Sequence, residues 1–426
     1  MKKVVRITPQ GKVEDLGPVH GAGRHPEFDE VDAKVALIQA LIPVALNAVG
    51  EALQAEITQL AGPRYSRTAG SPGVVRWGHQ RGSIYLADQK VPLTYQRARN
   101  RRTNAEVPVR TYQRLQLPRQ ADAGLFRKVL FGLSCRDYAA CAEAVPEAFG
   151  LSPSSVSRRF IRASAKQLQA LQERRLDGYD ILALVLDGKT FAEDAMVIAL
   201  GITGTGEKVI LGFVQTATEN EPVGAAFLRE LRERGLQTAQ GLLCVIDGAK
   251  GLRKAIQTVF GAEAVVQRCQ WHKRENVLEY LPKSQRPVWR RKLQAAYQKP
   301  SYPEAKAALL RVRSELRLVN ESAVKSLDEG LEETLTLHRL GVFPELGISL
   351  KTTNCLESLN ALVGQRTARV DRWRTSDQKQ RWLAAALLDI EPRLRRIKGF
   401  RALRLLRSAL QAELRGQVPR SASQAA

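Results

Sequence analysis

Ile181-Leu182-Ala183-Leu184-Val185-Leu186-Asp187-Gly188-Lys189-Thr190 is a short apolar run that ends in an acid and a glycine. Such a run predicts a buried β-strand. Leu242-Leu243-Cys244-Val245-Ile246-Asp247-Gly248 repeats the pattern. An acid that directly follows a buried strand lies at the edge of the sheet, where ligands bind. If the two strands are adjacent, Asp187 and Asp247 lie side by side.

Strand and helix patterns alternate around these two runs, which predicts an α/β region. The further strands expected are residues 196–202, 209–213 and 264–266, the first two of which complete a three-strand meander. The helices expected are residues 222–234 and 251–260. Residues 271–340 read as almost continuous helix, with breaks at Pro282, Pro300 and Pro303.

Two carboxylates this close repel each other unless a cation lies between them. Mg²⁺ prefers carboxylate oxygens and fits such a pair, with Mn²⁺ as a substitute. A third acid is expected from a later helix, and the candidate is Glu357, although each acid alone also fits a turn or surface position. Thr353 or Asn354 is expected to cap this helix. Glu357 borders its apolar stripe, which consists of Leu356, Leu359 and Val363.

The chain is strongly basic. Its 426 residues carry 66 Lys and Arg against 43 Asp and Glu, a net charge of +23, which points to a polyanion such as nucleic acid. The excess is concentrated at residues 64–136, with fifteen basic residues against three acids, and from residue 366 onward, with fifteen against five. Tyr and Trp residues are interleaved in the first segment, which favours phosphate contact with base stacking over a merely solvated surface. Its densest part holds Arg97, Arg99, Arg101 and Arg102.

A helix-turn-helix is predicted within residues 124–166. Residues 134–144 form its first helix, and Ser152-Pro153 supplies the cap and first residue of the second. A helix-turn-helix presents its second helix to DNA, whereas an ordinary helical hairpin is the alternative. The candidate DNA-contacting residues are Ser154, Ser157, Arg158 and Arg159, together with Lys250 beyond Asp247.

Four stretches taken together resemble the bacterial mutator-type insertion-sequence transposases. They are Asp187-Gly188, Asp247-Gly248-Ala249-Lys250-Gly251-Leu252, Gln267-Arg268-Cys269-Gln270-Trp271-His272-Lys273-Arg274-Glu275-Asn276-Val277 and Thr352-Thr353-Asn354-Cys355-Leu356-Glu357-Ser358-Leu359-Asn360. The resemblance covers residues from about 60 to 400. It implies a DDE transposase in which Asp187, Asp247 and Glu357 hold Mg²⁺ and cut and join DNA. It also implies an RNase H-like catalytic core that a helical insertion interrupts before the glutamate.

The expected fold is therefore a multidomain α/β protein, with an RNase H-like catalytic core interrupted by an α-helical insertion and preceded by helical, β-rich and helix-turn-helix DNA-binding modules. The expected segments are an N-terminal leader with helices (1–61), a small basic β-rich module (62–120), the helix-turn-helix region (121–175), the first part of the core (176–282), the helical insertion (283–346), and the completion of the core with basic C-terminal helices (347–426).

Cys269-x-x-His272 is the family's Cys/His signature. It is only half of a zinc site, since His338 is the sole later histidine, so packing or contact with a DNA strand is favoured over metal binding. Trp271 fits either stacking on an extruded base or a core position, and the signature favours the functional reading. Trp373 fits both equally.

The expected partners are the terminal inverted repeats of the element and its target DNA, bound by a homodimer because two transposon ends require two active sites. The alternative is a domesticated, inactive DNA-binding regulator. A tyrosine recombinase is excluded, because no tyrosine follows Tyr302. Five scattered cysteines, no signal peptide and no apolar run long enough to span a bilayer predict a cytoplasmic, nucleoid-associated protein.

Overall fold

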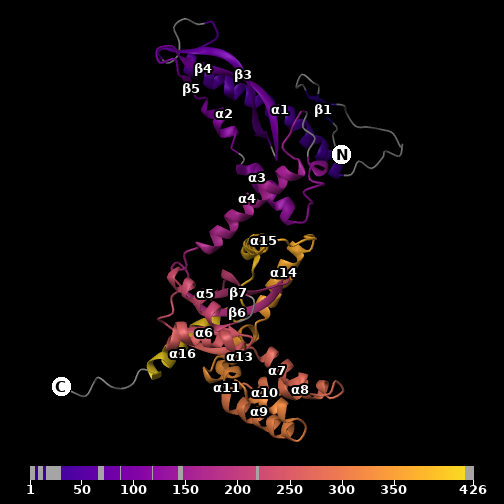
Figure 1. Ribbon diagram of the computed structural model, residues 1–426, viewed down its shortest axis with the longest axis vertical. Coiled ribbons are helices and arrows are strands. Elements are labelled where there is room, and N and C mark those ends of the chain that lie inside the picture. Colours follow the sequence, from indigo (N-terminus) through magenta and orange to yellow (C-terminus); the bar gives the residue numbers. More distant parts are fainter. Residues whose placement is uncertain are drawn as a thin grey trace, which may run out of the picture. The chain divides into compact units, whose positions relative to one another are not determined.

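The computed structural model describes residues 5–7, 13–15, 30–65, 72–86, 88–117, 119–142, 147–216 and 220–417. The chain divides into two compact units. The first consists of residues 1–121 and 141–150, and the second of residues 122–140 and 151–426. Figure 1 shows the helices and strands of each.

The first unit combines one long helix with an antiparallel hairpin, and the hairpin lies within residues 62–120, where strands are expected. Its elements are α1 (Glu30–Ala61), β3 (Val74–Leu86), β4 (Gln89–Asn100), β5 (Glu106–Val107) and α2 (Arg110–Leu115). Strands β3 and β4 pair antiparallel, and β5 adds to β4. Leu53 and Ile57 of α1 pack on Ala98 of β4 and on Val109. Burial of these apolar side chains joins the helix to the hairpin.

The N-terminal leader contains a short hairpin of β1 (Val5–Ile7) and β2 (Val13–Asp15), which pair antiparallel. The rest of the leader lies outside the described residues. The helices expected in the later part of residues 1–61 are one element, α1.

A five-stranded mixed sheet forms the centre of the second unit, in the order β10-β9-β6-β7-β8. The strands are β6 (Ile181–Phe191), β7 (Asp194–Thr203), β8 (Lys208–Thr216), β9 (Leu242–Ile246) and β10 (Ala264–Arg268). The meander is confirmed, because β6, β7 and β8 are consecutive and antiparallel. Strands β9 and β10 are parallel to β6 and extend the sheet on its other side.

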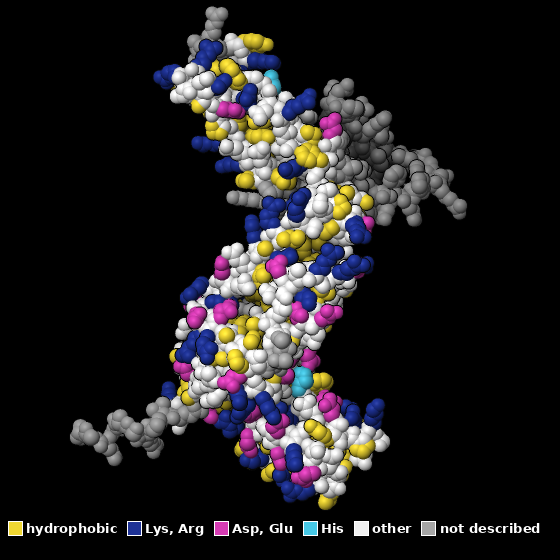
Figure 2. All heavy atoms as spheres, in the orientation of Figure 1, with side chains coloured by type: hydrophobic (Ala, Val, Ile, Leu, Met, Phe, Trp, Pro, Cys, Tyr) yellow, Lys and Arg dark blue, Asp and Glu magenta, His cyan; other side chains and the backbone are white. Residues whose placement is uncertain are grey.

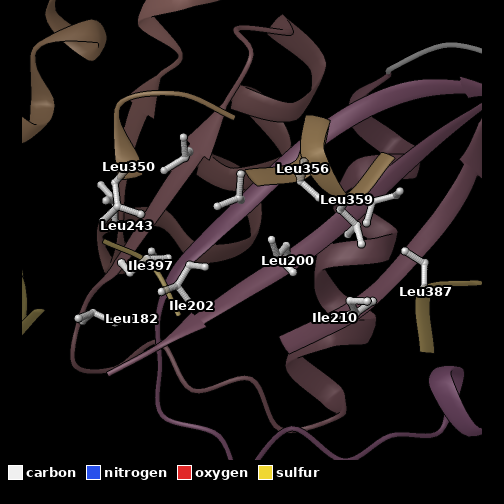
Figure 3. Packing of buried hydrophobic residues seen from close by; sticks show 14 of the residues in the cluster. Leu182, Leu200, Ile202, Ile210, Leu243, Leu350, Leu356, Leu359, Leu387 and Ile397 are labelled. Carbon is white, nitrogen blue, oxygen red and sulfur yellow. The ribbon is translucent and has the colours of Figure 1, made fainter. Parts of the chain in front are cut away.

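Helices cover both faces of this sheet. α5 (Glu221–Glu233) and α6 (Lys250–Phe260) pack on one face, and their apolar residues join Leu184, Leu186 and Ile246 in one buried cluster. The other face is covered by α13 (Phe343–Leu350), α14 (Asn354–Thr367), α15 (Ser376–Ile390) and α16 (Leu403–Gln417). Figure 3 shows this second cluster, where Leu356 and Leu359 of α14 lie over Leu200 of the sheet.

A separate helical layer is inserted between β10 and α13. It consists of α7 (Gln270–Glu279), α8 (Arg286–Tyr297), α9 (Tyr302–Arg317), α10 (Glu321–Asp328), α11 (Leu331–Thr334) and α12 (Thr336–Arg339). Its apolar side chains form their own buried cluster from Val277 to Leu335. The insertion was expected at residues 283–346, but Phe343 and Leu346 belong to the core of the sheet.

Three local predictions are wrong. Residues 134–142 form turns and a single 3-10 turn, Ala139–Cys141, in place of a helix; Ser134 Oγ accepts a hydrogen bond from the Arg136 N–H and so competes with helical pairing. Pro303 does not break the helix, because it lies in the first turn of α9, where a proline removes no hydrogen bond of the helix. Asp187 does not follow its strand, since β6 continues to Phe191.

The expected second helix of the helix-turn-helix is α4 (Pro153–Gln172). Ser152 caps it by accepting a hydrogen bond from the Ser155 N–H, as the sequence predicts. Phe160 of α4 packs on Trp382 of α15, with ring centroids 4.6 Å apart. α4 therefore lies against a helix of the core. α3 (Arg119–Leu130) precedes it.

Candidate active site

Asp187 and Asp247 lie at neighbouring positions on adjacent parallel strands. Leu186 of β6 is paired in register with Ile246 of β9, and each is followed by its aspartate. Neighbouring strands lie about 4.8 Å apart, so the two carboxylates are close. Asp187 is buried, with 6% of its surface exposed, and Asp247 is half-buried.

Both aspartates belong on the face of the sheet that carries α14. Leu186 and Ile246 point into the cluster with α5 and α6, whereas Val185 and Val245 point into the cluster with α14. Successive side chains of a strand alternate between faces, so the next residues, Asp187 and Asp247, face the α14 side.

The turn after Asp247 is held in one conformation. Its carboxylate Oδ1 accepts a hydrogen bond from the Ala249 N–H at 3.0 Å. Gly248 has φ +116°, and a Cβ there would lie 2.1 Å from Nε of Arg268. A side chain at residue 248 would therefore be strained and would displace the buried Arg268 guanidinium.

Cys269 follows β10 and contacts both the end of β9 and the start of α14. Its N–H donates to the carbonyl oxygen of Ile246 at 2.7 Å, directly before Asp247. Its Sγ accepts a hydrogen bond from Thr353 Oγ1 at 3.9 Å, and the same Oγ1 lies 3.5 Å from Nδ1 of His272. Thr353 occupies the N-cap position of α14, but its hydroxyl does not bond to the helix backbone. The Cys/His signature thus fixes the start of α14 relative to the end of β9.

His272 lies within the electrostatic influence of both aspartates. Hydrogen bonding with Cys269 raises the pKa of His272, burial opposes this, and the carboxylates of Asp187 and Asp247 raise it further. The imidazole therefore belongs to the same polar centre as the two acids.

A second tether joins α14 to the strand that carries Asp187. Lys189 Nζ donates a hydrogen bond to the carbonyl oxygen of Asn360 at 3.2 Å, and its burial lowers the pKa of Lys189. Lys189 lies two residues after Asp187 and so points to the same face. α14 is held at Thr353 and at Asn360, on either side of Glu357.

Glu357 is exposed in the first turn of α14, next to the apolar stripe. The stripe is confirmed, because Leu356, Leu359 and Val363 are buried in the sheet core. Within the described ranges, no three His, Cys, Asp or Glu side chains lie close enough together to hold a metal ion. The structure thus brings Asp187 and Asp247 together and holds Glu357 on a helix over the same face.

The basic cluster predicted to contact DNA lies in the last part of β4 and in the turn between β4 and β5. Arg101 and Arg102 are exposed. Arg99 lies over the ring of Trp77, with the guanidinium 4.9 Å from its centroid, and Arg97 pairs with Glu106 at 3.5 Å. Figure 2 shows many Lys and Arg side chains and few acids around the hairpin. Arg101 and Arg102 are therefore exposed to a polyanion, whereas Arg97 and Arg99 already contact neighbouring residues.

The candidates on α4 differ in exposure. Ser154 and Arg158 are exposed and Ser157 is half-buried, whereas Arg159 is only 5% exposed. Arg158 therefore reaches solvent, but Arg159 is a buried part of the unit. Lys250 is exposed at the start of α6 and pairs with Glu329 at 3.3 Å.

The two tryptophans also differ. Trp271 is 42% exposed, and its ring meets the His272 ring edge-on at 4.8 Å. Trp373 packs against Phe191 and Trp382, so it belongs to the core of the sheet.

Sequence reasoning missed the contributions of Lys189, Arg268 and Thr353. The alternation of side chains along β6 was enough to place Lys189 beside Asp187. Nothing local indicates that Arg268 packs on Gly248 or that the Thr353 hydroxyl turns toward Cys269, because those partners are distant in sequence.

A family model described as "Transposase, Mutator family" matches residues 23–393. The chain belongs to the mutator family of transposases. The resemblance read from the four sequence stretches is thereby confirmed. The matched range includes the aspartates of β6 and β9, the Cys/His signature and all of α14.

Curated relatives of this transposase are named for insertion sequences. It is 29% identical over 326 residues to the transposase for insertion sequence element ISRM5 of Rhizobium meliloti, covering 74% of this chain and 79% of that protein. It is 31% identical over 233 residues to the transposase for IST2 of Acidithiobacillus ferrooxidans, covering 52% and 76%. It is 29% identical over 245 residues to the transposase for IS6120 of Mycolicibacterium smegmatis, covering 56% and 74%.

No helix in the described part of the chain has the length and apolar character needed to cross a membrane.

Proposed function

We propose that this transposase binds the terminal inverted repeats of its element and performs metal-dependent strand cleavage and strand transfer by a DDE mechanism on an RNase H-like core. The observation that carries the proposal is the register of β6 and β9, which sets Asp187 beside Asp247. The sheet order β10-β9-β6-β7-β8, with a three-strand meander and two parallel strands, supports the RNase H-like assignment. We further propose a nucleoid-associated homodimer, because joining two ends requires two active sites.

The two aspartates fit a divalent cation. Asp187 is buried, and two neighbouring carboxylates out of bulk water repel each other unless a positive charge lies between them. Their donors are oxygens, which Mg²⁺ and Mn²⁺ favour. When bound, such ions activate the attacking water or 3′-hydroxyl and stabilise the leaving oxygen. Asp187 and Asp247 would hold them.

Glu357 is proposed as the third ligand. It belongs to α14, which the sheet core, Thr353 and Lys189 hold on the face of the two aspartates. Its side chain is exposed and so is free to turn toward a substrate phosphate and its ion. His272 lies beside the aspartates and contributes a nearby positive or hydrogen-bonding group for the DNA strand.

Metal binding is tested by titrating Mn²⁺ into the full chain and following the free ion by electron paramagnetic resonance. The wild-type protein should remove Mn²⁺ from solution at micromolar to millimolar concentrations. Asp187→Asn with Asp247→Asn should abolish this uptake while thermal unfolding stays cooperative. Equal uptake by the wild type and the double variant would contradict the proposed ligands.

Thr353→Val is expected to lower strand cleavage by about 10- to 100-fold, the usual cost of removing a group that orients a metal ligand. Valine keeps the shape of the side chain but lacks the hydroxyl that joins α14 to Cys269 and His272. The decrease should appear in kcat with little change in affinity for end DNA. Thr353→Ser should restore cleavage, and failure of serine to do so would show that the hydroxyl is not the cause.

Neutralising Arg97, Arg99, Arg101 and Arg102 together should lower affinity by a similar factor on every DNA sequence, because phosphate contacts carry no sequence information. The slope of log K against log salt should become shallower by up to about 0.9 for each phosphate that the variant no longer neutralises. A salt titration of the quadruple glutamine variant measures this. An unchanged slope would exclude the cluster from the DNA interface.

Arg158→Ala should weaken binding to the element ends about tenfold more than binding to random duplex, if α4 contacts bases. Arg159→Ala provides the contrast. Because Arg159 is buried, its replacement should lower the free energy of unfolding by about 1–3 kcal/mol. Fluorescence anisotropy with both duplexes and a urea titration separate the two effects. An equal decrease of affinity on both DNAs for Arg158→Ala would assign α4 a non-specific contact.

A further inference from the structure

A cavity of about 170 Å³ lies next to the candidate active site. It is bounded by α7, by the end of α8 and by the segment that leads from α13 into α14. The lining residues that bear on its chemistry are Trp271, Arg274, Gln294, Gln298, Lys351 and Asn354. Neither the metal site nor the basic hairpin uses these side chains.

The lining combines one aromatic face with uncommitted amides. Trp271 is 42% exposed, although its neighbours in the chain are the buried Gln270 and the half-buried His272. Within the part of the chain that the structure describes, the side-chain amides of Gln294, Gln298 and Asn354 make no hydrogen bond. Each amide offers both a donor and an acceptor.

Lys351 adds a positive charge to the rim. Its ammonium lies 5.7 Å from the centroid of the Phe343 ring and forms no ion pair with any described residue. The lining thus offers a flat apolar face, three amides and the Lys351 ammonium, with the Arg274 guanidinium paired to Glu275. These groups suit a planar heterocycle that carries hydrogen-bonding edges and an attached phosphate.

The cavity is contiguous with the polar centre of the two aspartates. Trp271 is followed by His272, whose ring it meets edge-on, and Thr352 in the cavity wall is followed by Thr353, which contacts that imidazole. The carboxylates of Asp187 and Asp247 in turn raise the pKa of His272. Asn354 lies one turn before Glu357 on α14. A nucleotide held here would therefore be near the phosphate at the acids.

We propose that this cavity receives one unpaired nucleobase of the DNA strand, next to the phosphate that is cut. Trp271 stacks on the base, the amides of Gln294, Gln298 and Asn354 meet its edges, and Lys351 contacts the backbone phosphate. This inference rests on the proposed function. Extrusion of one base costs stacking and pairing energy. Contacts in the cavity would offset this cost at one nucleotide position of the element's terminal sequence.

The test is a thermodynamic cycle. One base is removed from the DNA, the Trp271 side chain is removed from the protein, and the effects on affinity are compared singly and together. The probe is a pre-nicked duplex of the element's own end, with a single abasic nucleotide placed in turn at each position around the nick. Affinity is measured by fluorescence anisotropy with Ca²⁺ for the full-length wild type and for Trp271→Ala. Tyr280→Ala is the control, because Tyr280 is an exposed aromatic residue, at 51%, that follows α7 and does not line the cavity.

At one position the affinity of the wild type should fall about 5- to 100-fold without the base, the range for one base–aromatic stack. Trp271→Ala should bind both duplexes equally there, and Trp271→Phe should recover most of the difference. Tyr280→Ala should respond to the missing base as the wild type does. If the missing base and Trp271→Ala lower the affinity independently of each other at every position, the inference is overturned. Trp271 then contacts the groove or the surface of the DNA. Cleavage of the intact end by the wild type with Mg²⁺ is measured separately. If the end is not cleaved but the base and Trp271 are coupled in binding, only the proposed function is rejected.

Discussion

Asp187→Asn and Asp247→Asn are each expected to lower cleavage of end DNA by at least about a thousandfold. A ligand to a catalytic ion supports several kcal/mol of transition-state stabilisation, and each 1.4 kcal/mol is a factor of ten in rate. Asparagine keeps the volume of the side chain, so the packing around the buried Asp187 should survive. Affinity for end DNA should stay within about twofold, because neither residue belongs to the basic hairpin. Single-turnover cleavage and anisotropy measure the two quantities.

Asp177→Asn is the control for these variants. Asp177 belongs to the same unit but lies before β6, with 57% of its side chain exposed, and pairs with Arg175. It should cleave at the wild-type rate. Near-normal cleavage by either Asp187→Asn or Asp247→Asn would mean that the acids on β6 and β9 do not bind the ion.

Glu357→Gln is expected to lower cleavage by about a hundredfold or more without affecting folding. Glutamine is a poor ligand for Mg²⁺, which prefers charged oxygens. Because the side chain of Glu357 is exposed, a change of this size should not disturb the packing. The measurement is cleavage at saturating end DNA, with the unfolding midpoint as the check on folding.

Glu345 and Glu391, the glutamates on either side of Glu357 in the sequence, are the next acids to test. Both oxygens of Glu391 are bound by Arg174, at 2.7 and 2.8 Å, and one also accepts from the Ile210 N–H at 2.6 Å. Glu391→Gln should therefore lower the free energy of unfolding by about 1–3 kcal/mol and leave cleavage of the folded protein intact. Glu345→Gln, at an exposed position on α13, should change neither. If Glu357→Gln cleaves normally and Glu345→Gln does not, the third ligand is Glu345.

The sequence was sufficient for the sheet that carries the site. The apolar runs at 242–246 and 264–266 lie where β9 and β10 form, because a strand buried on both faces needs side chains of one kind throughout. The adjacency of Asp187 and Asp247 was only conditional in the sequence, since it depends on which strands pair, and the register of β6 and β9 decides it. The apolar stripe of α14 could also be predicted, because a helix that packs on a core carries apolar residues at helical spacing.

The missed features have local causes as well as contacts between distant segments. Residues 134–144 carry a helical pattern, but the Ser134 hydroxyl bonds locally and residues 134–142 form turns. Arg159 reads as a DNA contact beside Arg158, yet one step around a helix turns a side chain from solvent into the interior. Thr353 was read as a cap, and its hydroxyl instead joins Cys269 and His272 from a segment far away in the sequence.

Incubation of the full-length wild-type protein with a duplex of its element's own terminal sequence tests the central claim most directly. With Mg²⁺ or Mn²⁺, a nick on one strand at the tip of the element should appear and leave a 3′-hydroxyl. The nick should be absent with EDTA and with Asp247→Asn. Cleavage that persists in EDTA or in this variant, or wild-type protein that binds the end and never cuts it, would contradict a metal-dependent active site built on Asp187 and Asp247.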